Sequence, residues 1–197
     1  ADARAAMTDL CQRLDRLPPG AEERIAVEKY LERARLLLFS NTGAGPAAKA
    51  LAEQMAGGGN TWRERLLTEA VTNWASRNLA DARAWGESLP EGPARERALT
   101  GVASGWASSS ISEVAAWINA LPSSPSRNAA VDGFARVGLP RDPAGALEWL
   151  RTITHAETRL KTLRSAWSEW HWRNPEQAVA WRDNSVELTS AERAHLR

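Results

Sequence analysis

Four arginines recur along the chain at a constant spacing of 32 residues: Arg63, Arg95, Arg127 and Arg159. A guanidinium group holds a carboxylate or a phosphate through parallel hydrogen bonds, so a regular row of arginines could bind an acidic peptide or a phosphate backbone. The same groups could instead stack on indole rings, pair with acids or bond to carbonyl groups at helix ends. The spacing makes these four residues candidate binding residues and leaves both roles open.

A second candidate site is the run Trp170-His171-Trp172. Where other copies of the repeat carry small residues, such as Ala107 and Ser108, this copy carries His171 and Trp172. An aromatic residue that departs from the repeat is a better candidate for binding than one that follows it. The alternative interpretation is that Trp172 caps a local cluster of side chains.

Residues for catalysis or metal binding do not form a recognisable pattern. The three histidines, His155, His171 and His195, lack metal-ligand spacing, and Cys11 is the only cysteine. The sequence contains no phosphate-binding loop and no nucleophile-elbow motif. We therefore expect a non-enzymatic protein without a metal or a cofactor, in which Cys11 is a small buried side chain.

The elements that position these residues are set by a tryptophan repeat. Pairs of positions eleven residues apart recur every 32 residues, and only Gly138 breaks the pattern. The pairs are Trp74/Trp85, Trp106/Trp117, Gly138/Trp149 and Trp170/Trp181. A fixed period of this length is typical of repeat proteins, whose units bury apolar faces against one another. We expect these rings to fill the core, and Trp167 with Phe134 to occupy the volume left at Gly138.

Two helices are predicted in each repeat. Helix-capping residues follow the first Trp of each pair by four positions, at Asn78, Ser110, Asp142 and Asn174. Glu113 and Gln177 have capping-box spacing after two of these caps, as do Thr154–Glu157 and Thr189–Glu192 at other helix starts. Apolar residues at helical spacing predict the other helix of each pair at 61–76 and 93–108.

The predicted fold is all-α: a right-handed α-solenoid of antiparallel helix pairs in a single domain, 1–197. Residues 60–197 form the regular repeats, and residues 1–59 form an N-terminal cap and a degenerate repeat. In that segment we expect helices at Ala3–Leu17, Ala21–Ser40 and Pro46–Ala56, with turns at Gly43–Gly45 and Gly57–Gly59. Over residues 40–197 this pattern resembles the tetratricopeptide class of helical-hairpin repeats. The resemblance implies a scaffold for protein partners.

Composition narrows the function further. The net charge of +1 argues against non-specific nucleic-acid binding as the main task, and no apolar run is long enough to cross a bilayer. The leading hypothesis is a scaffold that binds a protein or peptide. The alternatives are RNA or single-stranded DNA binding through the arginines and exposed Trp, and an accessory domain of a larger enzyme.

The location of the protein is not determined by its composition. We expect a soluble segment and slightly favour the cytoplasm. Arg greatly outnumbers Lys, which indicates a GC-rich, bacterial genome and implies no function. The sequence opens at Ala1 without an initiator Met, so we expect a processed product or a fragment that could lack an upstream signal or anchor.

Overall fold

The computed structural model describes residues 2–14, 16, 32, 43–55 and 61–196, and no strand occurs among them. The helices described are α1 (Ala3–Leu14), α3 (Ala44–Gln54), α4 (Thr61–Ala75), α5 (Leu79–Ser88), α6 (Pro93–Ala107), α7 (Ile111–Ala120), α8 (Pro125–Gly138), α9 (Pro143–Arg151), α10 (Ala156–Arg173), α11 (Pro175–Asn184) and α12 (Ser190–His195). The all-α class is therefore confirmed. The helix predicted at Ala21–Ser40 and the turn at Gly57–Gly59 lie outside the described residues.

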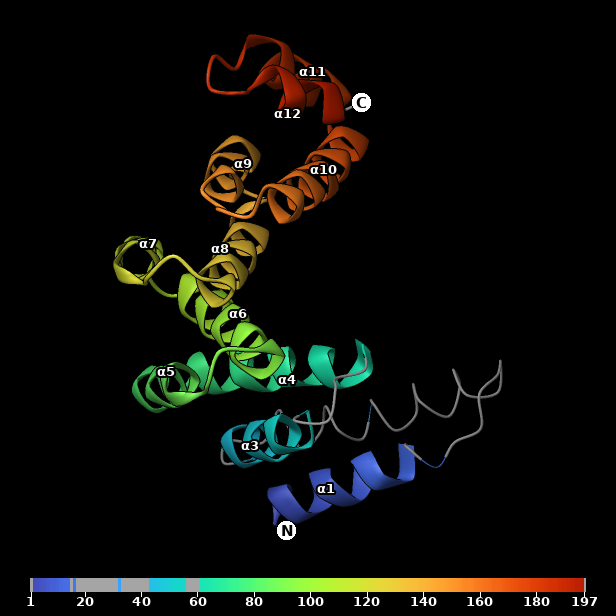
Figure 1. The fold of residues 1–197 in the computed structure, drawn as a ribbon, viewed down its shortest axis with the longest axis vertical. Coiled ribbons are helices and arrows are strands. Elements are labelled where there is room, and N and C mark those ends of the chain that lie inside the picture. The colour runs from blue at the N-terminus through green and yellow to red at the C-terminus, as the bar shows by residue number, and fades with distance from the viewer. Residues whose placement is uncertain (1, 15, 17–31, 33–42, 56–60, 197) are drawn as a thin grey trace.

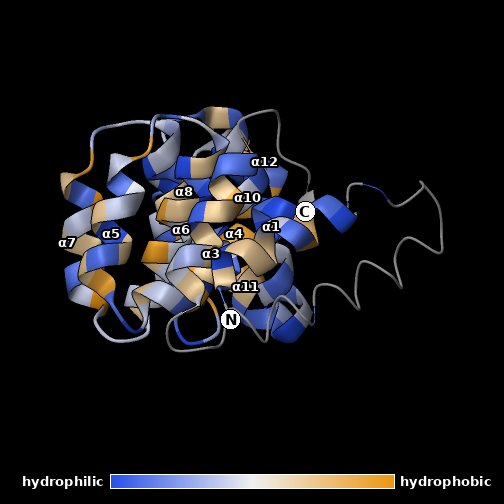
Figure 2. Cartoon of the chain, turned by 90° about the horizontal axis from the view of Figure 1, so that it is seen from below, coloured by the Kyte–Doolittle hydropathy of each residue, from blue (hydrophilic) through white to orange (hydrophobic). Residues whose placement is uncertain are grey.

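Helical hairpins follow one another along the long axis of the molecule (Figure 1). The first helices of three successive hairpins, α4, α6 and α8, pack directly on one another. Helices α5 and α7 lie to one side of this stack in both views (Figures 1 and 2). At the N-terminal end, α1 packs on α3 and α3 packs on α4, with Cys11 buried among them as expected. The right-handed superhelical sense of the solenoid stays a prediction.

The second helix of each hairpin begins where the sequence predicts. The side-chain oxygens of Asn78, Asp142 and Asn174 accept hydrogen bonds from the backbone N–H three residues later, at 3.2, 2.9 and 3.3 Å. Such bonds satisfy N–H groups that have no partner inside the helix. Ser110 occupies the same position before α7 but makes no capping bond through its side chain.

Several local predictions need correction. The capping box at Thr189–Glu192 is confirmed, but His155, and not Thr154, is the N-cap of α10. The reason is that the amide oxygen of Asn128 accepts the N–H of Thr154 at 3.2 Å, which draws Thr154 towards α8. In the N-terminal segment, α3 begins at Ala44, where a turn was expected, and α1 ends at Leu14 instead of Leu17.

The tryptophan pairs lie in contact within each hairpin. Ring centroids are 5.6 Å apart in Trp74/Trp85, 5.7 Å in Trp106/Trp117 and 5.9 Å in Trp170/Trp181. Trp106, Trp117 and Trp170 are buried, and the other paired rings are half-buried against the same core. Their predicted role in the core is confirmed. Each ring joins the two helices of its hairpin through apolar contact and tilted aromatic packing.

In the Trp106/Trp117 pair, both indole N–H groups donate hydrogen bonds to carboxylates. Trp117 Nε1 donates to Glu87 Oε1 at 2.8 Å, which ties α7 to α5 of the preceding hairpin. Burial opposes ionisation of Glu87, but hydrogen bonds from Arg83 and Trp117 outweigh it and hold the pKa of Glu87 below its ordinary value. Trp106 Nε1 donates to Glu113 at 3.2 Å, and α7 has no side-chain capping bond, so the capping box predicted at Glu113 does not form.

Phe134 replaces the ring that is missing at Gly138. It lies one helical turn earlier and meets Trp149 edge-on, with centroids 5.0 Å apart. This part of the hypothesis agrees with the structure. Trp167 instead serves its own hairpin, because it stacks on His171 at 4.7 Å and its Nε1 donates to the carbonyl of Ala178 at 3.2 Å.

Glycines set how closely the first helices approach one another. A Cβ added at Gly101 would lie 2.8 Å from the carbonyl oxygen of Thr68 on α4. One repeat later, a Cβ at Gly133 would lie 2.5 Å from the carbonyl oxygen of Thr100 on α6. Both distances are too short for a side chain, so the α4–α6 and α6–α8 contacts require glycine at this repeat position.

Candidate functional site

Arg95 and Arg159 use their guanidinium groups to close the ends of preceding helices. Arg95 Nη1 donates to the carbonyl oxygens of Glu87 and Leu89, each at 2.6 Å, at the C-terminus of α5. Arg159 Nη1 donates to the carbonyl of Ile153 at 2.8 Å, just beyond α9. Each arginine belongs to the first turn of its own helix, where a cation is unfavourable, but its charged group reaches the negative end of the helix before it.

The other two arginines of the row make different contacts. Arg127 Nη1 donates to the carbonyl of Thr152 at 3.2 Å, the residue that ends α9 of its own hairpin. The guanidinium of Arg63 lies 4.9 Å from the ring centroid of Trp62. Only Arg95 and Arg159 therefore repeat in contact as well as in sequence. Their intramolecular acceptors give them a structural role, and binding through them stays a prediction.

His171 and Trp172 point to different surroundings although they are neighbours in sequence. His171 is half-buried and stacks on Trp167, which lies one turn earlier on the same helix, α10. Trp172 is 85% exposed and is the most exposed aromatic side chain among the described residues. The structure does not join these two residues to the arginine row in one site.

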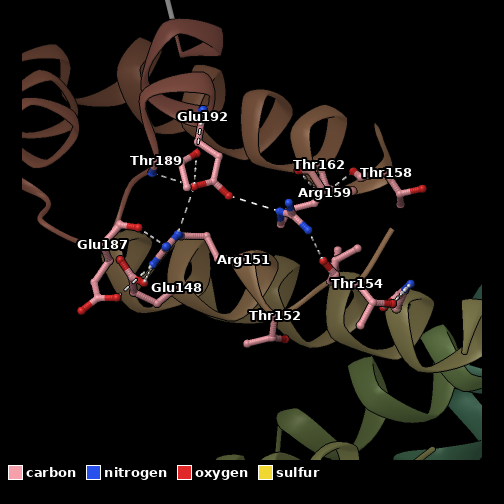
Figure 3. Close-up of polar contacts among 12 residues, drawn as sticks. Glu148, Arg151, Thr152, Thr154, Thr158, Arg159, Thr162, Glu187, Thr189 and Glu192 are labelled. Carbon is pink, nitrogen blue, oxygen red and sulfur yellow. Dashed lines mark hydrogen bonds and ion pairs between the residues drawn. The ribbon is translucent and has the colours of Figure 1, made fainter. Parts of the chain in front are cut away.

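A buried carboxylate joins α9, α10 and α12 (Figure 3). Glu192 has a side chain only 5% exposed, and its Oε1 accepts from Arg159 Nε at 3.2 Å. Its Oε2 accepts from the backbone N–H and the hydroxyl of Thr189, both at 2.9 Å, and lies 3.7 Å from Arg151 Nε. Arg151 is also paired with Glu148 at 2.8 Å and lies 3.7 Å from Glu187.

These donors control the ionisation of Glu192. Burial alone would raise its pKa, but the hydrogen bonds from Thr189 and the positive charge of Arg151 outweigh burial and lower the pKa of Glu192 below its ordinary value. The carboxylate is thus held ionised by groups from three helices. All of its oxygens are engaged inside the protein, which makes this cluster a structural clasp and leaves no open position for a ligand.

A groove with a volume of about 860 Å³ lies over α8, between α6 and α10. Its position follows from the glycine repeat. The residue that corresponds to Gly101 and Gly133 in the next copy is Ser165, which is exposed and lines the groove. Helix α10 makes its main contacts with α9 and α11, and not with α8. The first helices are therefore in close contact up to α8 and separate at α10.

Polar side chains from three successive repeats line this groove. Hydroxyl groups come from α6, from α10 and from the turns before α8 and α10, including Thr100, Ser124, Thr158 and Ser165. Asn128 closes one end, where its amide donates to the hydroxyl of Thr154 at 3.2 Å. Such a surface offers hydrogen-bond donors and acceptors along a length that an extended chain could follow. It presents no buried apolar pocket for a small ligand.

The sequence also carries a signal for this groove, outside the tryptophan positions of the repeat. Stepping by 32 residues from Arg65 gives Arg97, Ala129 and Lys161, so one long cation is replaced by a methyl group. Ala129 lies in the groove, while Arg97 and Lys161 belong to α6 and α10 on either side of it. Comparing non-tryptophan positions of the repeat would have identified this gap.

Within the described residues, no group of three or more His, Cys, Asp and Glu side chains could hold a metal ion. None of the described helices has the length and apolar character needed to cross a membrane. In comparisons with known proteins, no family model, curated protein or solved structure matches this chain.

Proposed function

We propose that the chain is a non-catalytic helical-repeat scaffold that binds an extended peptide segment of a protein partner in the groove across α6, α8 and α10. The observation that carries this proposal is the groove itself, which has a volume of about 860 Å³ and is lined mainly by polar residues of three repeats. An extended peptide has unpaired backbone N–H and C=O groups at regular intervals, and hydroxyl and amide side chains can satisfy them.

The arginine row and Trp172 support ligand binding less well. Arg95 and Arg159 already donate to helix-end carbonyls, so binding a phosphate backbone through them would break these bonds. Trp172 is exposed but stands alone, because no second exposed aromatic ring lies beside it on the described part of α10. The groove is also compatible with an accessory role beside a catalytic domain, since an accessory domain can bind an extended polymer chain in the same way.

The test introduces a long side chain on the floor of the groove, where it would block a bound peptide. Ala129→Arg restores the long cation that the same repeat position carries at Arg65 and Arg97, so the side chain is compatible with the helix. Ala116→Arg on the exposed surface of α7 is the matched control. Partners captured by the unmodified chain should be retained by the control and lost by Ala129→Arg, as measured by pull-down and mass spectrometry. An unchanged partner set in Ala129→Arg would falsify groove binding.

Two further measurements separate the alternatives. Nucleic-acid binding would weaken steeply as salt rises from about 50 to 200 mM, whereas peptide binding through neutral polar groups would change little. The triple variant Arg95→Ala, Arg127→Ala, Arg159→Ala should retain the partner set if these arginines serve only the fold. If the triple variant loses partners while it remains folded, as judged by circular dichroism, then the arginine row takes part in binding.

A further inference from the structure

Two charged groups in the groove have no ion pair with any residue that the structure describes. Glu96 is on α6 and Lys161 is on α10, at opposite walls of the groove. The other two cations that line the groove are already paired. Arg97 Nη2 lies 2.8 Å from Glu64 Oε2, and Arg136 Nε lies 2.8 Å from Asp132 Oδ2. The groove therefore presents one uncompensated negative charge and one uncompensated positive charge, on different walls.

Between these walls, the floor of the groove carries the short side chain of Ala129, where a long side chain would block a ligand. Ala129 stands between Arg97 and Lys161 in the repeat, and its methyl group leaves the space that a third cation would fill. A ligand can thus run from α6 over Ala129 to α10 and meet Glu96 first and Lys161 last. A segment with the complementary charges would satisfy both groups.

Resting on the proposed peptide-binding function, we propose that the groove selects an extended segment with a basic side chain against Glu96 and an acidic side chain against Lys161. Complementary charges at a partly exposed interface mainly determine which partner binds and in which register. A polyanion such as RNA or a run of acidic residues fits less well, because it would be repelled at the α6 wall. A polycation would be repelled at Lys161.

Helix geometry gives an expected spacing for the two charges. Packed helices such as α6 and α8 lie about 8–10 Å apart, and α10 lies farther from α8 than a packed helix would, so the crossing from α6 to α10 covers at least about 16–20 Å. The Glu96 and Lys161 side chains both extend into the groove and shorten this span by several ångströms. An extended chain advances about 3.3 Å per residue. The two ligand charges should therefore be separated by at least about four residues.

The experiment selects a phage-displayed library of random 12-residue peptides on the full chain. Recovered peptides should combine Lys or Arg with Asp or Glu at the expected separation more often than the unselected library does. Chosen peptides should bind Glu96→Lys and Lys161→Glu about two- to thirtyfold more weakly, because each reversal replaces an attraction with a repulsion. Selection on Glu96→Lys should recover peptides with two acidic residues, and selection on Lys161→Glu peptides with two basic residues.

The double variant provides the sharpest test. Glu96→Lys combined with Lys161→Glu again presents one charge of each sign, so it should return selection to peptides of mixed charge. Glu176→Lys on α11 and Arg141→Glu between α8 and α9 are matched reversals at exposed positions outside the groove. Both controls should recover the same peptides as the unmodified chain.

The experiments distinguish failure of the charge rule from failure of peptide binding in the groove. If Ala129→Arg blocks the recovered peptides but they show no charge pairing, the groove binds peptides and the charge rule is wrong. The charge rule is equally overturned if peptides of mixed charge bind the reversed variants as well as the unmodified chain. If no peptide is enriched, or if Ala129→Arg does not block those that are, peptide binding in the groove fails together with the charge rule.

Discussion

The α4–α6–α8 stack and the α8–α10 boundary are built from the same repeat, yet one is closed and the other is open. In the closed part, glycines at 101 and 133 place helix backbones in direct contact, with no room for a Cβ. In the open part, Ser165 occupies that position, and the units are joined by α9 and by the Glu192 clasp. One position in the repeat thus separates a region made for stability from a region that can receive a ligand.

The largest loss of stability is expected when a buried ring is removed from the closed part. Trp106→Ala should lower the free energy of unfolding by about 3–5 kcal/mol, because a large cavity replaces a ring that is only 7% exposed. Trp172→Ala is the control, since this ring is 85% exposed and its loss should cost less than about 0.5 kcal/mol. Urea unfolding followed by circular dichroism measures both. Equal losses would contradict the assignment of Trp106 to the core.

The second prediction tests the glycine position itself. Gly133→Val should destabilise the protein by at least about 1–3 kcal/mol, because its Cβ would lie 2.5 Å from the Thr100 carbonyl oxygen and force α6 and α8 apart. Ser165→Val makes the same side chain at the equivalent position of the next repeat. That position is exposed, so we expect a change within about 0.5 kcal/mol. Similar effects on thermal unfolding at both positions would show that the spacing of α8 and α10 has another cause.

The third and smallest effect concerns acid and the C-terminal clasp. The pKa of Glu192 is lowered in the folded protein, so its ionisation stabilises the fold fully above its ordinary value near 4.5. This contribution should be lost as the pH falls from about 4.5 through the folded pKa. Hydrogen exchange of α12 amides should rise over that range, while amides of α6 stay protected. Glu192→Gln should raise exchange in α12 at neutral pH and remove its dependence on acid.

The outcome of that experiment also bears on the comparison. The closed part is held mainly by apolar and backbone contacts, which do not titrate, with the Arg97–Glu64 ion pair at its edge, whereas the clasp depends on a carboxylate that receives donors from Thr189 and Arg159. If α6 and α12 lost protection together in acid, the molecule would unfold as one cooperative unit. The clasp would then not be the acid-sensitive part of the structure.

Much of the fold could be predicted because it depends on local rules. Caps such as Asn78 and Asp142 satisfy backbone groups of their own helix, and the apolar spacing around Trp106 is a property of one helix. The cap of α10 was predicted wrongly, since Asn128 draws Thr154 away through a contact 26 residues distant. Such long-range competition leaves no trace in the local pattern.

The candidate site was less predictable for a related reason. The arginine row was visible as a repeat, but a constant spacing does not say whether a guanidinium faces solvent or the carbonyls of Glu87 and Leu89. The groove depends on what is missing, a long side chain at Ala129 and a glycine at Ser165. Exceptions to a repeat gain meaning only when the distances between its units are known.

The small side chain at Ala129 suggests how this architecture could be lengthened by design. The same repeat position on α6 is Arg97, which borders the groove and pairs with Glu64 of α4, so trimming Arg97 to alanine would extend the channel one unit towards α4 and admit a longer chain. The number of repeats with a shortened side chain would then determine the length of the bound chain. The length of ligand that such a repeat protein accepts would be set by shortening surface side chains, with the hydrophobic core unchanged.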